Sequence, residues 1–185
     1  MTNLEKSLSG LPINGTAVYA EDRCAHMTTR YHWSGGKHMF SNEESLVQCF
    51  VQHLQSDSSP WGSMKFETEF FYQRGRTDLI GVVNGDNIIA FEAKLQRWKS
   101  ALQQAYRNKC FADNSYVILP NEHAIIAAQY EVEFRRRGIG LCGVSSDEIT
   151  ILFESAQNEP LQPWLKKQAL VYIGTIGGED DFGSF

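Results

Sequence analysis

The segment from Arg76 to Leu95, RTDLIGVVNGDNIIAFEAKL, constrains the fold of this chain more than any other part of the sequence. Two runs rich in Ile, Val and Phe, residues 78–83 and 87–95, flank the pair Asn84-Gly85. β-Branched and aromatic residues favour strands, and an Asn-Gly pair readily adopts the positive φ angles of a tight turn. The segment therefore predicts a β-hairpin.

Side chains of the second run alternate between the two faces of the predicted strand. One face is uniformly apolar and is expected to lie in the core: Ile89, Phe91, Ala93 and Leu95. The other face begins with Ile88 and Ala90 and ends with Glu92 and Lys94. Because an isolated buried charge is costly, an acid and a base on such a strand need partners or a metal ion.

Two explanations fit this charged end of the strand. A cross-strand salt bridge at a sheet edge is the simpler one. In the other, Asp78 and Glu92 bind a hard divalent cation through oxygen, and Lys94 orients a water molecule or stabilises a developing negative charge.

The metal-site hypothesis makes a prediction about the turn. Residues directly opposite in an antiparallel pair share a face, and a two-residue turn at Asn84-Gly85 would place Asp78 opposite Phe91, on the apolar face. Asp78 must instead share the face of Glu92. The hypothesis therefore predicts a three-residue loop over residues 84–86, or a tight turn with a bulge.

Apolar periodicity predicts the neighbouring elements. A helix is expected to begin at Ser41 or Asn42, with Glu43 in the middle of its apolar arc and Glu44 at the edge of that arc. Lys65–Tyr72 alternates as a strand does. Further elements are expected after the hairpin: a helix over Trp98–Ala112, a strand over Asn114–Leu119, a helix over His123–Arg137 that ends at Gly138, and strands over Leu141–Val144 and Ile149–Phe153.

The order of these motifs resembles that of the PD-(D/E)xK nuclease superfamily. The matching pieces are Glu43-x-x-Leu46-Val47, Gly75-Arg76-Thr77-Asp78, Glu92-Ala93-Lys94 and Trp98-x-x-Ala101-Leu102-x-Gln104-Ala105. The first piece is similar to the opening of Holliday-junction resolvases, and the last to the exonuclease domains attached to helicases. Thr77 stands where the superfamily's name has Pro, a position not expected to carry chemistry.

This resemblance implies an α/β fold with a restriction-endonuclease-like core, a mixed β-sheet flanked by helices in the order α-β-β-β-α-β. It implies that Asp78, Glu92 and the backbone carbonyl of Ala93 bind Mg²⁺ or Mn²⁺, and that Lys94 activates or positions the attacking water. Glu43 would complete the site or assist a second metal ion. Gln104 would make an accessory contact from the helix that follows.

The function that these residues favour is a metal-dependent nuclease that hydrolyses DNA phosphodiester bonds. The alternative is a catalytically silent module of the same fold that binds or regulates partner proteins. The chain carries a net charge of −5, but residues 74–109 carry +4 and the remainder −9. Phosphate attraction would then be local to the site. Residues expected to contact nucleic acid are Arg74, Arg76, Arg97, Lys99 and Arg107.

Outside a nuclease-like domain over residues 41–176, the sequence predicts two less regular segments. Residues 1–40 read as an irregular extension, whose Cys24, His26, His32 and His38 fit no common zinc-finger spacing. Residues 177–185 read as a flexible acidic tail ending in Phe. This tail resembles the partner-recruiting tails of single-stranded-DNA-binding proteins, although a frayed terminus with a solubilising charge cluster is the favoured explanation.

Several sequence features bear on the compartment and the assembly of the protein. The chain has no apolar run near the ~18 residues of a membrane span, and it begins without the basic residues of a signal peptide. Its four cysteines show no paired spacing, as expected for reduced thiols in a cytoplasmic protein. The sequence leaves open whether the chain forms a homodimer, as many small enzymes that cut both strands do.

Overall fold

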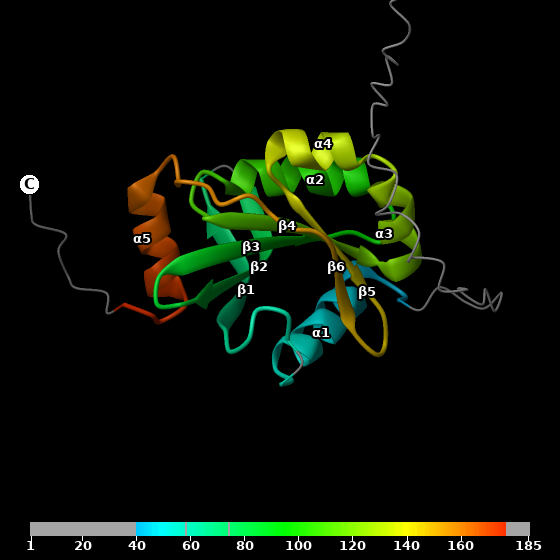
Figure 1. Ribbon diagram of the computed structural model, residues 1–185. Coiled ribbons are helices and arrows are strands. Elements are labelled where there is room, and N and C mark those ends of the chain that lie inside the picture. Colours follow the sequence, from blue (N-terminus) through cyan, green and yellow to red (C-terminus); the bar gives the residue numbers. More distant parts are fainter. Residues whose placement is uncertain (1–39, 58, 74, 177–185) are drawn as a thin grey trace, which may run out of the picture. The chain divides into compact units, whose positions relative to one another are not determined.

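A computed structural model describes residues 40–57, 59–73 and 75–176 of the chain. These residues form an α/β fold in which a six-stranded mixed sheet packs against five helices (Figure 1). The elements follow in this order: α1 (Glu43–Leu54), β1 (Lys65–Tyr72), β2 (Gly75–Val83), β3 (Asn87–Ala93), α2 (Trp98–Asn108), β4 (Asn114–Pro120), α3 (Asn121–Ala128), α4 (Glu131–Arg137), β5 (Gly140–Val144), β6 (Ile149–Phe153) and α5 (Pro163–Tyr172). The elements from α1 to β4 have the predicted order α-β-β-β-α-β.

The strands lie in the sheet in their sequence order, from β1 to β6. β3, β4 and β5 are parallel, and the pairs β1–β2, β2–β3 and β5–β6 are antiparallel. A parallel pair needs a crossover connection, and α2 and the α3–α4 pair supply the two crossovers. No helix within the described ranges is long and apolar enough to cross a membrane.

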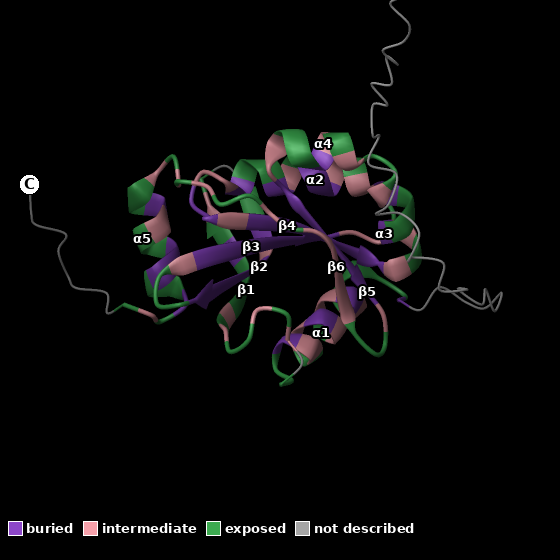
Figure 2. Cartoon of the chain, viewed as in Figure 1, coloured by how far each residue is buried: buried purple, intermediate pink, exposed green. Residues whose placement is uncertain are grey.

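Both faces of the sheet are covered by helices, and the central strands β3, β4 and β5 are buried between them (Figure 2). α1 packs on the face that carries Ile89, Phe91 and Ala93, as predicted for this set of side chains. On the opposite face, α5 covers Ile88 and Ala90, and α2, α3 and α4 cover the side chains of β4 and β5. The alternation along β3 thus assigns its residues to two separate cores.

The loop between β2 and β3 has the length that the metal-site hypothesis requires. Val83 pairs with Asn87, which leaves residues 84–86 as a three-residue loop. Asn84 and Gly85 have φ angles of 54° and 95°, in the region that Asn and Gly adopt at low cost. The register continues to Leu79 opposite Phe91, so that Asp78 comes next, opposite Glu92. The prediction of a three-residue loop is confirmed.

β1 contains one residue with a left-handed backbone conformation. Glu69 has a φ angle of 59°, which is uncommon for a residue other than Gly, Asn or Asp. Phe66 and Phe70 are four residues apart and would share one face of a regular strand. Instead, Phe66 packs in the core under α1 and Phe70 in the core under α5. The left-handed residue lets this edge strand contribute one aromatic ring to each core.

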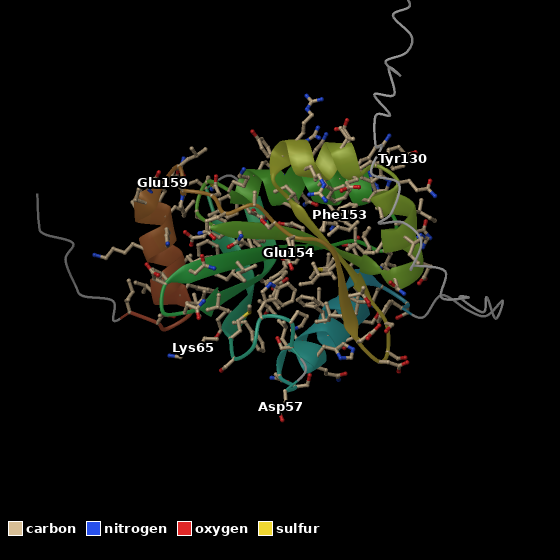
Figure 3. The ribbon with its side chains drawn as sticks, in the orientation of Figure 1. Asp57, Lys65, Tyr130, Phe153, Glu154 and Glu159 are labelled. Carbon is tan, nitrogen blue, oxygen red and sulfur yellow. The ribbon has the colours of Figure 1, made fainter. Side chains whose placement is uncertain are left out.

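Several predicted helices differ in extent from the structure. α1 begins as expected, with a capping box between Asn42 and Ser45. α2 ends at Asn108, earlier than the predicted Ala112. In place of the helix expected over residues 123–137 the structure has two helices, and Tyr130 lies at the interruption between them (Figure 3). The ring centroids of Tyr130 and Trp98 are 4.7 Å apart, so the residue between the two helices packs against the start of α2.

The sequence predicted the end of α4 but not the presence of α5. α4 ends at Gly138, with a φ angle of 68°, as predicted. α5 was not predicted; it begins with Pro163, a residue suited to the first helical position. The extension over residues 1–39, with its four candidate zinc ligands, and the tail from residue 177 lie outside the described residues.

Candidate functional site

The ends of β2 and β3 bring the two predicted carboxylates together. Backbone pairing between these strands stops at Leu79 and Phe91. Beyond this point the side chain of Asp78 makes a hydrogen bond to the backbone of β3. Its Oδ2 accepts a hydrogen bond of 2.9 Å from the backbone N–H of Ala93. Glu92, the residue opposite Asp78, is fully buried, whereas the side chain of Asp78 is 17 % exposed. The site therefore has one buried carboxylate and one that solvent reaches.

The environment of Glu92 disfavours its charge. Burial, with a further contribution from the charge of Asp78, raises the pKa of Glu92 to about 8, although Asn108 and Lys94 act in the opposite direction. Asn108 donates a hydrogen bond to Oε1, whereas Oε2 is buried and has no hydrogen-bond partner among the described residues. Two carboxylates with one unsatisfied buried oxygen form a site that a cation would stabilise.

Lys94 connects this site to the first helix. Its Nζ donates to Oε2 of Glu43 at 2.8 Å and to the backbone carbonyl of Ala93 at 2.9 Å. The Lys94 side chain is 15 % exposed and that of Glu43 is 49 % exposed. The expectation that Glu43 lies on the buried face of its helix is therefore wrong, because the first residue of α1 lies beyond the edge of the core. Its contact with Lys94 nevertheless brings it to the site.

Three residues that the sequence analysis did not assign to the site form a hydrogen-bonded network with Glu92. Asn108, the last residue of α2, donates from Nδ2 to Oε1 of Glu92 at 2.7 Å. Its Oδ1 accepts from the hydroxyl groups of Tyr72 at 2.8 Å and Thr77 at 2.9 Å. Asn108, Thr77 and Glu92 are all fully buried. We refer to these three residues and the half-buried Tyr72 together as the buried network.

One residue of the buried network, Asn108, could have been recognised from the sequence as a residue that needs a buried partner. Asn108 lies seven residues after Ala101 and three after Ala105, on the apolar face of an amphipathic helix, where a polar side chain needs a partner. Thr77 was expected to carry no chemistry, yet its hydroxyl group is one of the two donors that Asn108 accepts. No pattern in the sequence connects these two residues, which are 31 positions apart.

Gln104, the predicted accessory residue, lies one helical turn before Asn108. Its Oε1 is buried and has no hydrogen-bond partner within the described part of the chain. Gln104 lines a groove of about 400 Å³ on the outer side of α2, together with Ser100, Gln103, Tyr106, Arg107 and Arg137. Asn108, rather than Gln104, makes the contact from α2 to the carboxylates.

The basic residues predicted to contact nucleic acid have different surroundings. Arg76 pairs with Glu69 at 2.8 Å and lies 3.8 Å from Asp78, so its charge is partly engaged within the site. Lys99 lies over the rings of Trp98 and Tyr130. Arg97 and Arg107 are exposed at the start and near the end of α2. Arg74 lies outside the described residues.

The residues at the site fit a hard divalent cation in their chemistry. Carboxylate and carbonyl oxygens are the ligands that Mg²⁺ and Mn²⁺ prefer, and Oε2 of Glu92 has no hydrogen-bond partner among the described residues. Within residues 40–57, 59–73 and 75–176, no group of three or more His, Cys, Asp or Glu side chains is arranged to hold a metal ion. A metal ion here would thus depend on the Ala93 carbonyl, water or substrate for its remaining ligands.

Comparisons with known proteins inform the fold but not the activity. No family model matches the chain, and no curated protein matches its sequence. A solved structure of a protein of unknown function from Silicibacter pomeroyi is similar, with a TM-score of 0.54 and 17 % sequence identity. The similarity covers 74 % of this chain and 86 % of that one. The chain therefore shares its α/β fold, a six-stranded mixed sheet with helices, with another protein.

Proposed function

We propose that this protein is a metal-dependent nuclease with a restriction-endonuclease-like core. The observation that carries the proposal is the convergence of Asp78, Glu92 and Lys94 at the ends of β2 and β3, where Oε2 of Glu92 is buried without a partner. The order of elements from α1 to β4 and the Glu-x-Lys spacing support the same conclusion.

The carboxylates of Asp78 and Glu92 and the carbonyl of Ala93 would hold Mg²⁺ or Mn²⁺. When bound, such an ion supplies Lewis-acid polarisation of a phosphodiester and lowers the pKa of bound water. Asp78 has the more accessible carboxylate, and its hydrogen bond to the Ala93 N–H fixes its orientation. Glu92 offers a buried oxygen from a rigid strand, as precise positioning requires.

Lys94 acts as a proton-transfer or positioning group. Its ammonium group already lies 2.9 Å from the Ala93 carbonyl oxygen, so it can orient a water molecule at the site or neutralise developing negative charge. Glu43 holds this ammonium group at 2.8 Å. In this role Glu43 positions Lys94 and does not need to touch the substrate.

DNA is the substrate that we propose, and the distribution of charge supports it. The segment over residues 74–109 contains seven Lys or Arg and three acidic residues, two of which are the proposed metal ligands. Binding a cation would make this region more positive and favour a polyanion. Exposed Arg97, Lys99 and Arg107 on α2 are the proposed phosphate contacts.

A second candidate function is a binding or regulatory module that has the same fold without the chemistry. One observation favours it: two of the three donors of Lys94 Nζ are engaged with Glu43 and the Ala93 carbonyl, and the described residues include no cluster of three metal-ligating side chains. Such a protein would act through partner proteins, for which the acidic tail is a candidate contact.

The two functions are separated by a cleavage assay on linear, circular, branched and single-stranded DNA. The nuclease should cut at least one of these with Mg²⁺ or Mn²⁺, should stop when the metal is chelated, and should be inactive as the Asp78→Asn variant. A matched control is Asp147→Asn, which changes an exposed acid in the turn between β5 and β6. A wild-type protein that cuts none of these substrates with either metal would favour the binding module.

A further inference from the structure

The carboxylate of Glu92 has two oxygens in different environments. Oε1 accepts the hydrogen bond from Asn108 at 2.7 Å, while Oε2 is buried and has no partner among the described residues. A carboxylate can turn about its last torsion at little cost, so nothing in Glu92 itself determines which oxygen faces the site. The surroundings must set this orientation.

The amide of Asn108 provides that constraint. Its Oδ1 accepts from two hydroxyl groups, those of Tyr72 at 2.8 Å and Thr77 at 2.9 Å. Reversing the amide would leave the hydroxyl hydrogens of Tyr72 and Thr77 without this acceptor and, in the ionised form of Glu92 that binds a metal, would point Oδ1 at another acceptor, Oε1. Because unmade hydrogen bonds of buried groups are costly, the two hydroxyl groups fix the amide with its Nδ2 toward Glu92.

We infer that Asn108 is a positioning residue that presents Oε2 of Glu92 to the metal ion, and that Tyr72 and Thr77 determine its orientation. This inference rests on the proposed function, since it concerns how that site binds its metal. Among the described residues both hydroxyl groups donate to Asn108 Oδ1 and not to Glu92, so we expect them to orient the Glu92 carboxylate through the Asn108 amide.

The network also joins four elements of the fold. Tyr72 ends β1, Thr77 lies in β2 and Asn108 ends α2, while Glu92 lies in β3. Beyond Leu79 no backbone pairs continue between β2 and β3. The buried network therefore links β2 to β3 where the regular ladder has stopped, and it adds to the hydrogen bond that Asp78 accepts from the Ala93 N–H.

The test uses Mn²⁺ binding by calorimetry, with the full-length protein and the double variant Tyr72→Phe/Thr77→Val. This variant keeps Asp78, Glu92 and Asn108, and it removes only the two hydroxyl groups that fix the amide. We expect Mn²⁺ affinity to fall by about 10- to 100-fold, the range typical when partners of metal ligands are lost. Each single variant should lose less, because one hydroxyl group still holds Oδ1.

A second double variant separates positioning from folding. Glu92→Gln/Asn108→Asp exchanges donor and acceptor: the new amide at position 92 can donate to the new carboxylate, which still accepts from Tyr72 and Thr77. Its melting temperature should exceed that of Asn108→Leu, in which the two hydroxyl groups and Oε1 of Glu92 lose their partner, while Mn²⁺ binding stays lost because the carboxylate at position 92 is absent.

The outcomes distinguish this inference from the proposed function. If the wild-type protein binds Mn²⁺ and a folded Tyr72→Phe/Thr77→Val variant binds it equally tightly, the positioning role is overturned and the nuclease proposal is unaffected. If the wild-type protein binds no Mn²⁺, both are overturned. Should Glu92→Gln/Asn108→Asp be no more stable than Asn108→Leu, the assigned hydrogen-bond directions are wrong and the inference is overturned with them.

Discussion

The two halves of β3 show how one strand serves two different purposes. In its first half, Ile88 and Ala90 are fully buried against α5 and the apolar side chains of β1 and β2. In its second half, Glu92 is equally buried on the same face, but its neighbours are Asp78 and Asn108. Burial stabilises the first half by about 25 cal/mol per Å² of apolar surface, whereas at Glu92 it opposes ionisation.

The apolar part of the strand stabilises the folded state, whereas the burial of a carboxyl group at the other end lowers its stability. Apolar contacts along β3, β4 and β5 hold the sheet together, and removing one is expected to weaken the whole domain. The carboxylate end is held by hydrogen bonds, and at neutral pH it contains a buried acid that resists ionisation. The proposed metal site accounts for this character, since a cation bound there would stabilise the ionised carboxylates of the folded state.

The largest expected effect comes from removing either carboxylate. Asp78→Asn and Glu92→Gln should each abolish measurable cleavage and weaken Mn²⁺ binding together, because amide oxygens carry no charge to match the cation. Calorimetry and plasmid cleavage on the same preparations check this. Retention of metal binding in both variants would show that the ion, if present, binds elsewhere.

Lys94→Ala should separate metal binding from catalysis. An ammonium group cannot coordinate a cation, so its removal should leave Mn²⁺ affinity unchanged or increase it. Cleavage should fall by about 10²- to 10⁴-fold, as for a lost proton-transfer group. Parallel titration and single-turnover cleavage measure both quantities, and full activity in this variant would remove Lys94 from the proposed mechanism.

Ile88→Ala tests the apolar half of the strand. Loss of a fully buried Ile side chain should lower the free energy of unfolding by about 2–5 kcal/mol. Since Ile88 lies four residues from Glu92 in the other half of β3, Mn²⁺ affinity of the remaining folded protein should change little. Urea denaturation and calorimetry below the melting temperature check the two expectations. A large change in affinity with normal stability would contradict the division between the halves.

The pH dependence of stability tests the polar half. The pKa of Glu92 is raised from 4.5 to about 8 in the folded protein, so between these values the folded state holds a proton that the unfolded state has released. Stability of the metal-free protein should therefore fall as pH rises from about 5 to 8, by up to ~1.4 kcal/mol per pH unit from this group.

Glu92→Gln supplies the control for this pH dependence. It removes the titrating group but keeps an oxygen that can accept from Asn108, so its stability should vary less across the same interval. Urea denaturation with a chelator at several pH values measures both proteins. Parallel curves for the wild type and the variant would show that Glu92 is already ionised in the folded state at neutral pH.

The sequence predicted much of this arrangement because local patterns carry it. Alternation along residues 87–95 assigned each side chain to its face, and the requirement that Asp78 share the face of Glu92 predicted the three-residue loop. Capping residues placed the start of α1. These features depend on neighbours within a few positions of the chain, which is the range over which sequence patterns are informative.

What the sequence did not reveal depends on long-range packing. The buried network joins residues 72, 77, 92 and 108 from four different elements, and no periodicity relates them. The left-handed Glu69 was likewise unexpected, because Glu has no local preference for that conformation. α5 has exposed Trp164, Val171 and Tyr172, so its apolar residues do not form the single stripe from which a surface helix is recognised.

The smallest expected effect belongs to the link between α1 and this end of β3. Glu43→Ala removes the partner that holds Lys94 Nζ at 2.8 Å, but the Glu43 side chain is 49 % exposed, and ion pairs with so much solvent contact contribute about 0–1 kcal/mol. Cleavage should therefore fall by less than about tenfold, with Mn²⁺ affinity unchanged. Glu44→Ala is the matched control on the same helix turn: its side chain is exposed and contacts Gln48, so cleavage should remain at the wild-type level. If Glu43→Ala instead abolishes Mn²⁺ binding as Asp78→Asn is expected to, Glu43 is a metal ligand rather than the partner of Lys94.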